Sequence, residues 1–229
     1  MKIIGLLGGM SWESTVTYYQ LINEKVKKEL GGLHSAKCLL YSVDFHEIED
    51  CQARGDWAES GRLLGQAAVS LEKAGADFLV LCTNTMHKVA ADIQEQVSIP
   101  LLHIAEVTAG ALLDNQIRKV ALLGTKYTME QDFYKARLTE RSIEVMIPDE
   151  AERRQINEVI FRELCLGEVR RESKEFFLGV IGRLTRLGAQ GVILGCTEIG
   201  LLIKQEDTAA PLFDTTRIHA EKAVDLALS

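Results

Sequence analysis

Residues 79–85 read LVLCTNT and residues 192–198 read VILGCTE, and these two segments decide the fold. Each is a short apolar run that ends in small residues with hydroxyl or thiol groups. Thr83 of the first segment corresponds to Cys196 of the second, 113 residues later. Such runs are typical of buried parallel strands, and open α/β sheets bind ligands at the carboxyl ends of these strands. A chain that carries this unit twice is expected to consist of two similar halves.

Two further pairs of segments repeat in the same order. GLLGGMS at residues 5–11 matches ALLGTKY at 121–127, and PLLH at 100–103 matches PLFD at 211–214, with offsets of 116 and 111 residues. Offsets this similar indicate an internal duplication. We therefore predict an α/β fold of two pseudo-symmetric domains, each a small parallel sheet flanked by helices, with the active site in the cleft between them.

The positions of strands and helices can be predicted from the pattern of apolar residues. Short apolar runs alternate with segments in which apolar residues recur at helical spacing. We expect strands at residues 2–7, 37–43, 78–82, 101–104, 120–123, 143–147, 192–194 and 212–213. Apolar residues at helical spacing from 63 to 74 predict a helix that ends at Gly75. Thr128 followed by Gln131 predicts a capping box that opens another helix.

The composition limits the class of protein. The 229 residues are 47% hydrophobic and 26% charged, which is ordinary for a globular protein with one large or two small domains. A net charge of −7 offers no basic surface to nucleic acid, so no nucleic-acid partner is expected. The first apolar run is too short for a signal peptide or a membrane span, so we expect a cytoplasmic protein that does not bind membranes.

Two kinds of cofactor site are not expected. The five cysteines include no C-x-x-C pair and should be free thiols, and the five histidines show no compact metal-ligand pattern, so no metal site is predicted. The GLLGG stretch lacks the G-x-G-x-x-G spacing of a dinucleotide site. It is expected to form a tight turn, after which Met10 and Ser11 offer backbone N–H groups to a bound anion.

Cys196 is the strongest candidate for a catalytic base or nucleophile. A thiol at the start of a helix is expected to have a pKa below its ordinary value of about 8.5, which favours the reactive thiolate. Side chains alternate along a strand, so Cys82 should point towards the core while Thr83 faces the ligand edge.

Three polar residues near Thr83 and Cys196 can each be given a structural role instead of a role in ligand binding or catalysis. Thr85 either caps a helix or binds the ligand, and the run of polar residues after the strand favours ligand binding. Glu198 has the same two interpretations, and capping is at least as well supported. His87 is expected to pack or to orient its loop rather than to transfer protons.

Three motifs together resemble those of the aspartate/glutamate racemase superfamily, especially its aspartate-racemase branch. They are GGMSWEST at residues 8–15 with Tyr18 and Tyr19, NTMH at 84–87, and LGCTE at 194–198. The resemblance implies a pseudo-symmetric, often dimeric enzyme that racemises amino acids without pyridoxal phosphate, metal or nucleotide. It also implies that the C-terminal segment returns to the first domain. The expected domains are residues 1–104 plus 209–229, and residues 105–208.

The resemblance implies two-base catalysis, in which one cysteine from each half flanks the substrate Cα. This chain has Thr83 where the family has its first cysteine, and Cys82 is one residue out of register. A thiol ionises near neutral pH, whereas an aliphatic hydroxyl is a weak base that can still donate a proton. The expected reaction is therefore abstraction from L-aspartate or L-glutamate by Cys196, and reprotonation from the opposite face through Thr83, directly or through water.

The resemblance also indicates which residues bind the substrate carboxylates. A family loop often reads the side-chain carboxylate with an arginine, but here no arginine occurs before Arg54, so Gln52 or His46 is expected to take that part. The other candidates are Met10, Ser11, Asn84, Thr85, Thr125, Tyr127, Thr128, Thr197 and Glu198.

Two other classes of function fit the same residues. Related folds carry out hydantoin racemisation, maleate isomerisation and arylmalonate decarboxylation, some with a single key cysteine. Alternatively, replacement of one cysteine has left an amino-acid-binding protein without turnover. A small-molecule substrate and a homodimer are expected, while the preferred amino acid and its enantiomer are left open.

Overall fold

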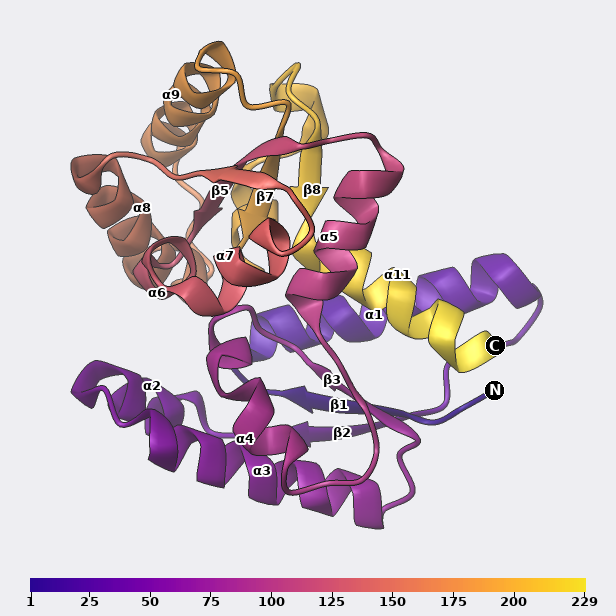
Figure 1. Cartoon of the computed structure of the whole chain (residues 1–229). Helices are drawn as coiled ribbons and strands as arrows, with labels where there is room; N and C mark the ends of the chain where they lie inside the picture. The colour runs from indigo at the N-terminus through magenta and orange to yellow at the C-terminus, as the bar shows by residue number, and fades with distance from the viewer. The chain divides into compact units, whose positions relative to one another are not determined.

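The computed structural model describes residues 1–229, which form two compact units. Unit 1 comprises Met1–Ile104 and His219–Ser229, and unit 2 comprises Ala105–Ile218. Each unit is a four-stranded parallel sheet flanked by helices (Figure 1). The expected α/β class with two similar domains is therefore confirmed. No helix combines the length and the apolar composition that crossing a membrane requires.

Unit 1 is built on a sheet with the strand order β2-β1-β3-β4. Its strands are β1 (Ile4–Gly8), β2 (Cys38–Ser42), β3 (Phe78–Leu81) and β4 (Leu101–Leu102). Its helices are α1 (Trp12–Leu30), α2 (Phe45–Arg54), α3 (Trp57–Lys73) and α4 (Ala90–Gln94), with the 3₁₀ helix η1 (Thr85–Val89) and most of α11 (Thr215–Leu228).

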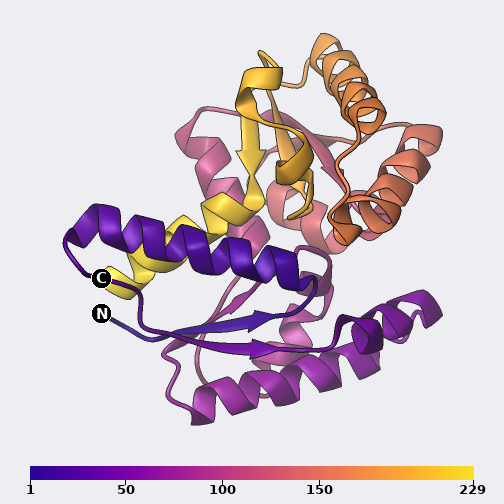
Figure 2. The same cartoon turned by 180° about the vertical axis from the view of Figure 1, so that it is seen from behind.

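Alternate residues of the unit 1 strands enter cores on opposite faces of the sheet. Ile4 and Leu6 pack with α1 and the end of α11, whereas Leu7 and Leu79 pack with α2, α3 and α4. Figures 1 and 2 show these two layers, and both chain termini lie close together. The amide of Lys2 donates to the carbonyl of Ala227 over 2.8 Å, which fixes this proximity.

Unit 2 repeats the topology with the strand order β6-β5-β7-β8. Its strands are β5 (Lys119–Gly124), β6 (Glu144–Met146), β7 (Gly191–Gly195) and β8 (Leu212–Asp214). Its helices are α5 (Ile104–Asp114), α6 (Lys126–Glu130), α7 (Asp132–Thr139), α8 (Glu150–Arg162), α9 (Arg171–Arg186) and α10 (Ile199–Leu202), with the 3₁₀ helices η2 (Leu164–Leu166) and η3 (Gln205–Asp207). All eight strands expected from the sequence are present.

The strand registers establish which residues of the two units are equivalent. Leu7 pairs with Leu81 in unit 1, and Leu123 pairs with Leu194 in unit 2. Two residues beyond these pairs come Thr83 in one unit and Cys196 in the other. The sheets therefore give the same correspondence as the sequence repeat.

One domain boundary differs from the expectation. Residues 209–218, expected in the first domain, belong to unit 2, where β8 is hydrogen-bonded to β7. Only the chain from His219 onward joins unit 1. The boundary after residue 104 agrees with the division of the structure. The helix that follows the last strand of each sheet thus packs in the other unit: α5 after β4, and most of α11 after β8.

The predicted capping box at Thr128 and Gln131 is wrong. The N-cap of α6 is Thr125, whose hydroxyl accepts from the amide of Thr128 over 3.3 Å, and Gln131 lies just beyond the helix. The helix begins earlier because β5 continues to Gly124, which pairs with Gly195. Thr128 is therefore the third residue of the helix. The helix predicted from 63 to 74 is confirmed as the second part of α3, with Ala74 as C-cap before Gly75.

Candidate active site

The loop after β3 separates Cys82 from Thr83, as strand alternation predicts. Cys82 is fully buried in the core beneath α1 and α11, and its thiol lies 3.6 Å from the carbonyl oxygen of Val80. Burial raises the pKa of the Cys82 thiol far above its ordinary value. Thr83 is 7% exposed and belongs to no apolar cluster, and Asn84 and Thr85 follow it in the same loop. Cys82 is thus a core residue.

Gln52, on α2, contacts the 3₁₀ helix η1 that follows this loop. Its amide nitrogen donates to the sulfur of Met86 over 2.9 Å, and its side chain is buried. His46, the other residue proposed to read a side-chain carboxylate, lies on the exposed side of the same helix. There it lies beside Glu49 and Asp50. One ring nitrogen of His46 and one carboxylate oxygen of each acidic residue all lie within 4.8 Å of one another. Of the two candidates, only Gln52 adjoins the Thr83 loop.

The turn between β1 and α1 is held by hydroxyl groups. Ser11 is the N-cap of α1 and accepts from the amide of Ser14 over 3.3 Å. The Thr15 hydroxyl accepts from the amide of Gly9 over 2.8 Å and donates to the carbonyl of Ser11 over 2.9 Å. Met10 packs its side chain into the core beneath α2 and α3, so only its backbone can face a ligand. Sequence reasoning missed Thr15, although it lies four residues after Ser11 in the GGMSWEST motif.

Gly9 makes a close backbone approach that no other residue allows. Its φ is +97°, and a Cβ atom there would lie 2.3 Å from the carbonyl oxygen of Val43. The turn that precedes Met10 and Ser11 therefore requires glycine at this position.

In unit 2 the Cys196 thiol is paired with a carboxylate. The sulfur of Cys196 donates to Oε2 of Glu198 over 2.9 Å, and the Thr197 hydroxyl donates to the same oxygen over 2.7 Å. Cys196 is 8% exposed and Glu198 is 3% exposed. Glu198 makes no side-chain capping bond to α10, so its oxygen serves the thiol and not the helix.

The expected lowering of the Cys196 pKa is wrong. Burial, the neighbouring Glu198 carboxylate and the nearby Cys165 thiol together raise the pKa of Cys196 well above its ordinary value. The helix that follows, α10, has only four residues and provides little dipole to oppose these effects. Cys196 is therefore a neutral thiol at rest, hydrogen-bonded to a base.

Thr125 and Thr128 form the corresponding turn after β5. Their hydroxyl oxygens lie 3.2 Å apart, and Thr128 is fully buried. A Cβ atom on Gly195 would lie 3.3 Å from the methyl carbon of Thr128, so Thr128 packs against the strand that leads to Cys196. Tyr127 is half-buried, and the ammonium of Lys126 lies 4.9 Å from its ring centre.

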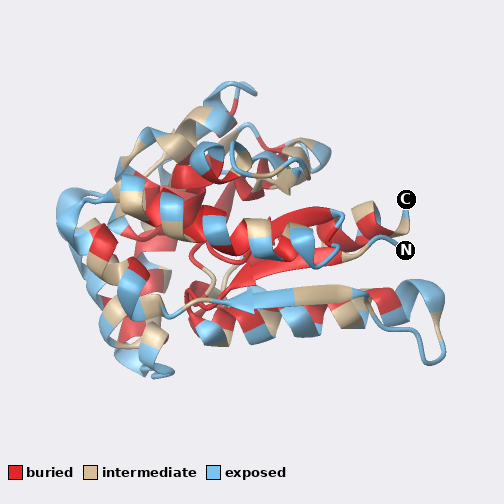
Figure 3. Cartoon of the chain, turned by 90° about the horizontal axis from the view of Figure 1, so that it is seen from below, coloured by how far each residue is buried: buried red, intermediate tan, exposed pale blue.

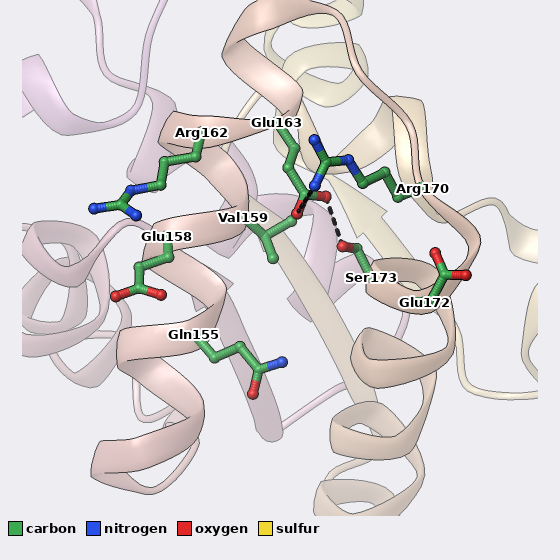
Figure 4. A pocket seen from close by; sticks show the side chains of 8 residues that line it. All are labelled: Gln155, Glu158, Val159, Arg162, Glu163, Arg170, Glu172 and Ser173. Carbon is green, nitrogen blue, oxygen red and sulfur yellow. Dashed lines mark hydrogen bonds and ion pairs between the residues drawn. The ribbon is translucent and has the colours of Figure 1, made fainter.

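Two cavities of unit 2 lie outside these turns. One of about 430 Å³ lies between α8 and α9 (Figure 4), where the Glu163 carboxylate accepts from the Ser173 hydroxyl over 2.6 Å and pairs with Arg170. It contains none of the residues predicted for the site. The other, of about 560 Å³, adjoins α10 and β8 and is lined in part by Gly200 and Asp214.

The structure thus brings the predicted residues together within each unit. In unit 1 the Met10–Ser11 turn and the Thr83–Thr85 loop follow the paired strands β1 and β3 at one edge of the sheet, with Gln52 beside the loop. In unit 2 the Thr125 turn and residues 196–198 follow the paired strands β5 and β7.

Comparison with known proteins places these motifs in a wider group. Residues 7–223 match the family model of Asp/Glu/hydantoin racemases. The chain is 56% identical to a candidate Asp/Glu racemase from Yersinia pestis, and each chain is covered completely, with a TM-score of 0.93. It is 37% identical to an aspartate racemase homologue from Pyrococcus horikoshii, also over both complete chains, with a TM-score of 0.85. It is 24% identical over 99% of both chains to the broad specificity amino-acid racemase RacX of Bacillus subtilis.

Proposed function

Because this chain belongs to the Asp/Glu/hydantoin racemase family, we propose that it racemises a free amino acid at Cα without a cofactor. Cys196 removes the Cα proton of the L-enantiomer, and Thr83 returns a proton to the opposite face. The observation that carries this proposal is the 2.9 Å hydrogen bond from the Cys196 thiol to the Glu198 carboxylate.

Glu198 makes the neutral thiol usable as a base. The raised pKa of Cys196 means that a thiolate must be generated when it is needed, and the carboxylate that already accepts the thiol hydrogen bond is placed to take that proton. The thiolate then takes the Cα proton, forming an S–H bond while the C–H electron pair moves into the substrate carboxylate. Hydrogen bonds from backbone amides and from Asn84 to that carboxylate stabilise the resulting negative charge.

The Thr83 hydroxyl completes the reaction as a proton donor. Its O–H bond breaks as the new C–H bond forms, and solvent returns a proton to the oxygen. A hydroxyl is a far weaker base than a thiolate, so the kcat for the D-enantiomer is low. Enantiomers have equal free energies in water, so kcat/KM is equal in both directions, and any apparent one-way behaviour arises from saturation.

Aspartate, glutamate or both are the proposed substrates. The relatives from Yersinia pestis and Pyrococcus horikoshii are described as a candidate Asp/Glu racemase and an aspartate racemase homologue, at 56% and 37% identity. Gln52 is the side chain that supports recognition of a second carboxylate, because it adjoins the Thr83 loop and carries an amide donor. A neutral amide distinguishes acidic from polar side chains less sharply than an arginine does.

A homodimer is part of the proposal. Trp12, Val16 and Tyr19 recur along one side of α1 and are 64%, 53% and 52% exposed. The edge strand β2 of the same unit also exposes Leu40 and Tyr41, and Figure 3 shows that this strand is largely uncovered. Exposed aromatic side chains with an open strand edge are typical of surfaces that pair with another chain.

Deuterium exchange tests the proposed reaction. Incubation of L-aspartate or L-glutamate with the protein in D₂O should give α-deuterated product and the D-enantiomer, measured by mass spectrometry and chiral HPLC. Cys196→Ala should abolish both signals, while Cys82→Ala, the matched control in the other unit, should keep them. The opposite pattern would contradict the assignment. Absence of deuteration with every common amino acid would instead indicate an amino-acid-binding protein.

A further inference from the structure

Three histidines form a cluster in unit 1 beside the Thr83 loop. The ring centres of His87 and His103 lie 4.7 Å apart, and those of His87 and His219 lie 5.7 Å apart. His87 is 2% exposed and His219 is fully buried. The hydrogen bonds of the buried His87 show which backbone groups it holds.

The two hydrogen bonds of His87 define its protonation state. Nδ1 lies 2.8 Å from the carbonyl oxygen of Thr83, which can only accept, so Nδ1 carries the proton. Nε2 accepts from the amide of Ile104 over 3.2 Å and therefore carries none. The carbonyls of Thr83 and Leu102 favour the charged ring. Burial and the neighbouring His103 and His219 outweigh them and lower the pKa of His87 well below its ordinary value.

We propose that His87 is the positioning residue for Thr83: its Nδ1–H holds the Thr83 carbonyl, and this bond directs the hydroxyl towards the substrate Cα. The inference rests on the proposed racemisation. Thr83 lies outside the strand, where the sheet no longer fixes its backbone, and its amide donates to the carbonyl of Leu81 over 2.9 Å. The bond from His87 fixes the other side of the same residue.

The hydrogen bond from the Ile104 amide to Nε2 ties His87 to a second backbone segment. Ile104 is the last residue of unit 1 before the chain enters unit 2. His87 therefore links the Thr83 backbone to Ile104, and the bond to Ile104 requires a neutral ring because Nε2 must accept the hydrogen bond.

Two substitutions separate the two bonds. Asparagine carries its amide group at the position of Nδ1, so His87→Asn keeps a donor for the Thr83 carbonyl. Glutamine carries its amide group at the position of Nε2, so His87→Gln keeps an acceptor for Ile104 and loses the bond to Thr83. Both replace the same buried ring, so each is the control for the other.

The readout is the ratio of D-product to α-deuterated L-substrate in D₂O. Return of a deuteron by Cys196 gives deuterated L-amino acid, whereas delivery by Thr83 gives the D-enantiomer, so the ratio compares delivery by Thr83 with return by Cys196. We expect His87→Gln to lower this ratio by about 100-fold, the effect of a displacement of about 1 Å in a reacting group, and His87→Asn to stay close to the wild type. An unchanged ratio in His87→Gln, or an equal fall in both variants, would overturn the proposal.

A second measurement uses the wild-type protein, without any substitution. Long-range ¹H–¹⁵N NMR spectra of histidine-labelled protein at pH 7 should show His87 as the neutral Nδ1–H tautomer, and an Nε2–H or a charged ring would refute the geometry. Failure of the racemase proposal looks different. In that case the wild type itself gives no deuteration, whatever the state of His87.

Discussion

The stability of unit 1 should depend on pH through His219. Its Nδ1 accepts from the Tyr18 hydroxyl over 2.9 Å, and its Nε2 donates to the carbonyl of Leu102 over 2.9 Å. Burial lowers the pKa of His219 to about 4, with a smaller contribution from His103. In the unfolded chain a histidine titrates near 6.5, so below that pH the unfolded state binds the proton more readily than the folded state.

The size of the effect follows from this difference. Each pKa unit corresponds to about 1.4 kcal/mol, so the full shift corresponds to about 3 kcal/mol. The stability that His219 contributes is complete above pH 6.5 and is lost as the pH falls towards 4. Between pH 7 and pH 4.5, His219 alone should lower the free energy of unfolding by about 2 kcal/mol.

Tryptophan fluorescence during urea unfolding measures this unit specifically, because both tryptophans, Trp12 and Trp57, lie in unit 1. The variant His219→Gln keeps a donor for Leu102 but does not titrate. It should lose about 2 kcal/mol less than the wild type between pH 7 and pH 4.5. Exposed His34→Gln serves as the control and should follow the wild type. Parallel pH curves for the wild type and His219→Gln would refute the reasoning.

Four further substitutions test individual features. Gly9→Ala should destabilise the fold by about 3 kcal/mol in urea unfolding, because its φ is +97° and the new Cβ would meet the backbone of Val43. Glu198→Gln should slow α-deuteration by about 100-fold or more, since the acceptor of the thiol proton is lost. Thr83→Cys should raise turnover of the D-enantiomer in chiral HPLC, and an unchanged rate would contradict the weak-base role of the hydroxyl. Trp12→Asp should shift the protein from dimer to monomer in size-exclusion chromatography with light scattering.

The strands could be predicted because parallel sheets bury both faces. Each strand is therefore a short, continuous apolar run, and the repeated runs at 79–81 and 192–194 reveal both sheets. The alternation of Cys82 and Thr83 follows from the same geometry, which is why the sequence alone assigns one to the core and the other to the edge.

Features that depend on tertiary contacts could not be predicted from the sequence. The pKa of Cys196 is set by burial and by Glu198, whereas the sequence indicates only the start of a helix. The cap of α6 depends on where β5 ends, and two threonines three residues apart are both suitable caps. The assignment of residues 209–218 failed because a strand and the helix after it belong to different units, which no local pattern records.

The helix after the last strand of each sheet belongs to the other unit, and this arrangement affects how the chain folds during its synthesis. Multidomain chains usually complete their N-terminal domain first as they leave the ribosome. Here the core of unit 1 includes Ala220, Ala223, Val224 and Ala227, which are translated only after all of unit 2. Until then, the apolar face of α1 has no α11 against it, while unit 2 already has its complete sheet. Unit 1 is therefore the first unit to be translated and the last to complete its core. A nascent chain halted before His219 would expose the apolar residues of that incomplete core.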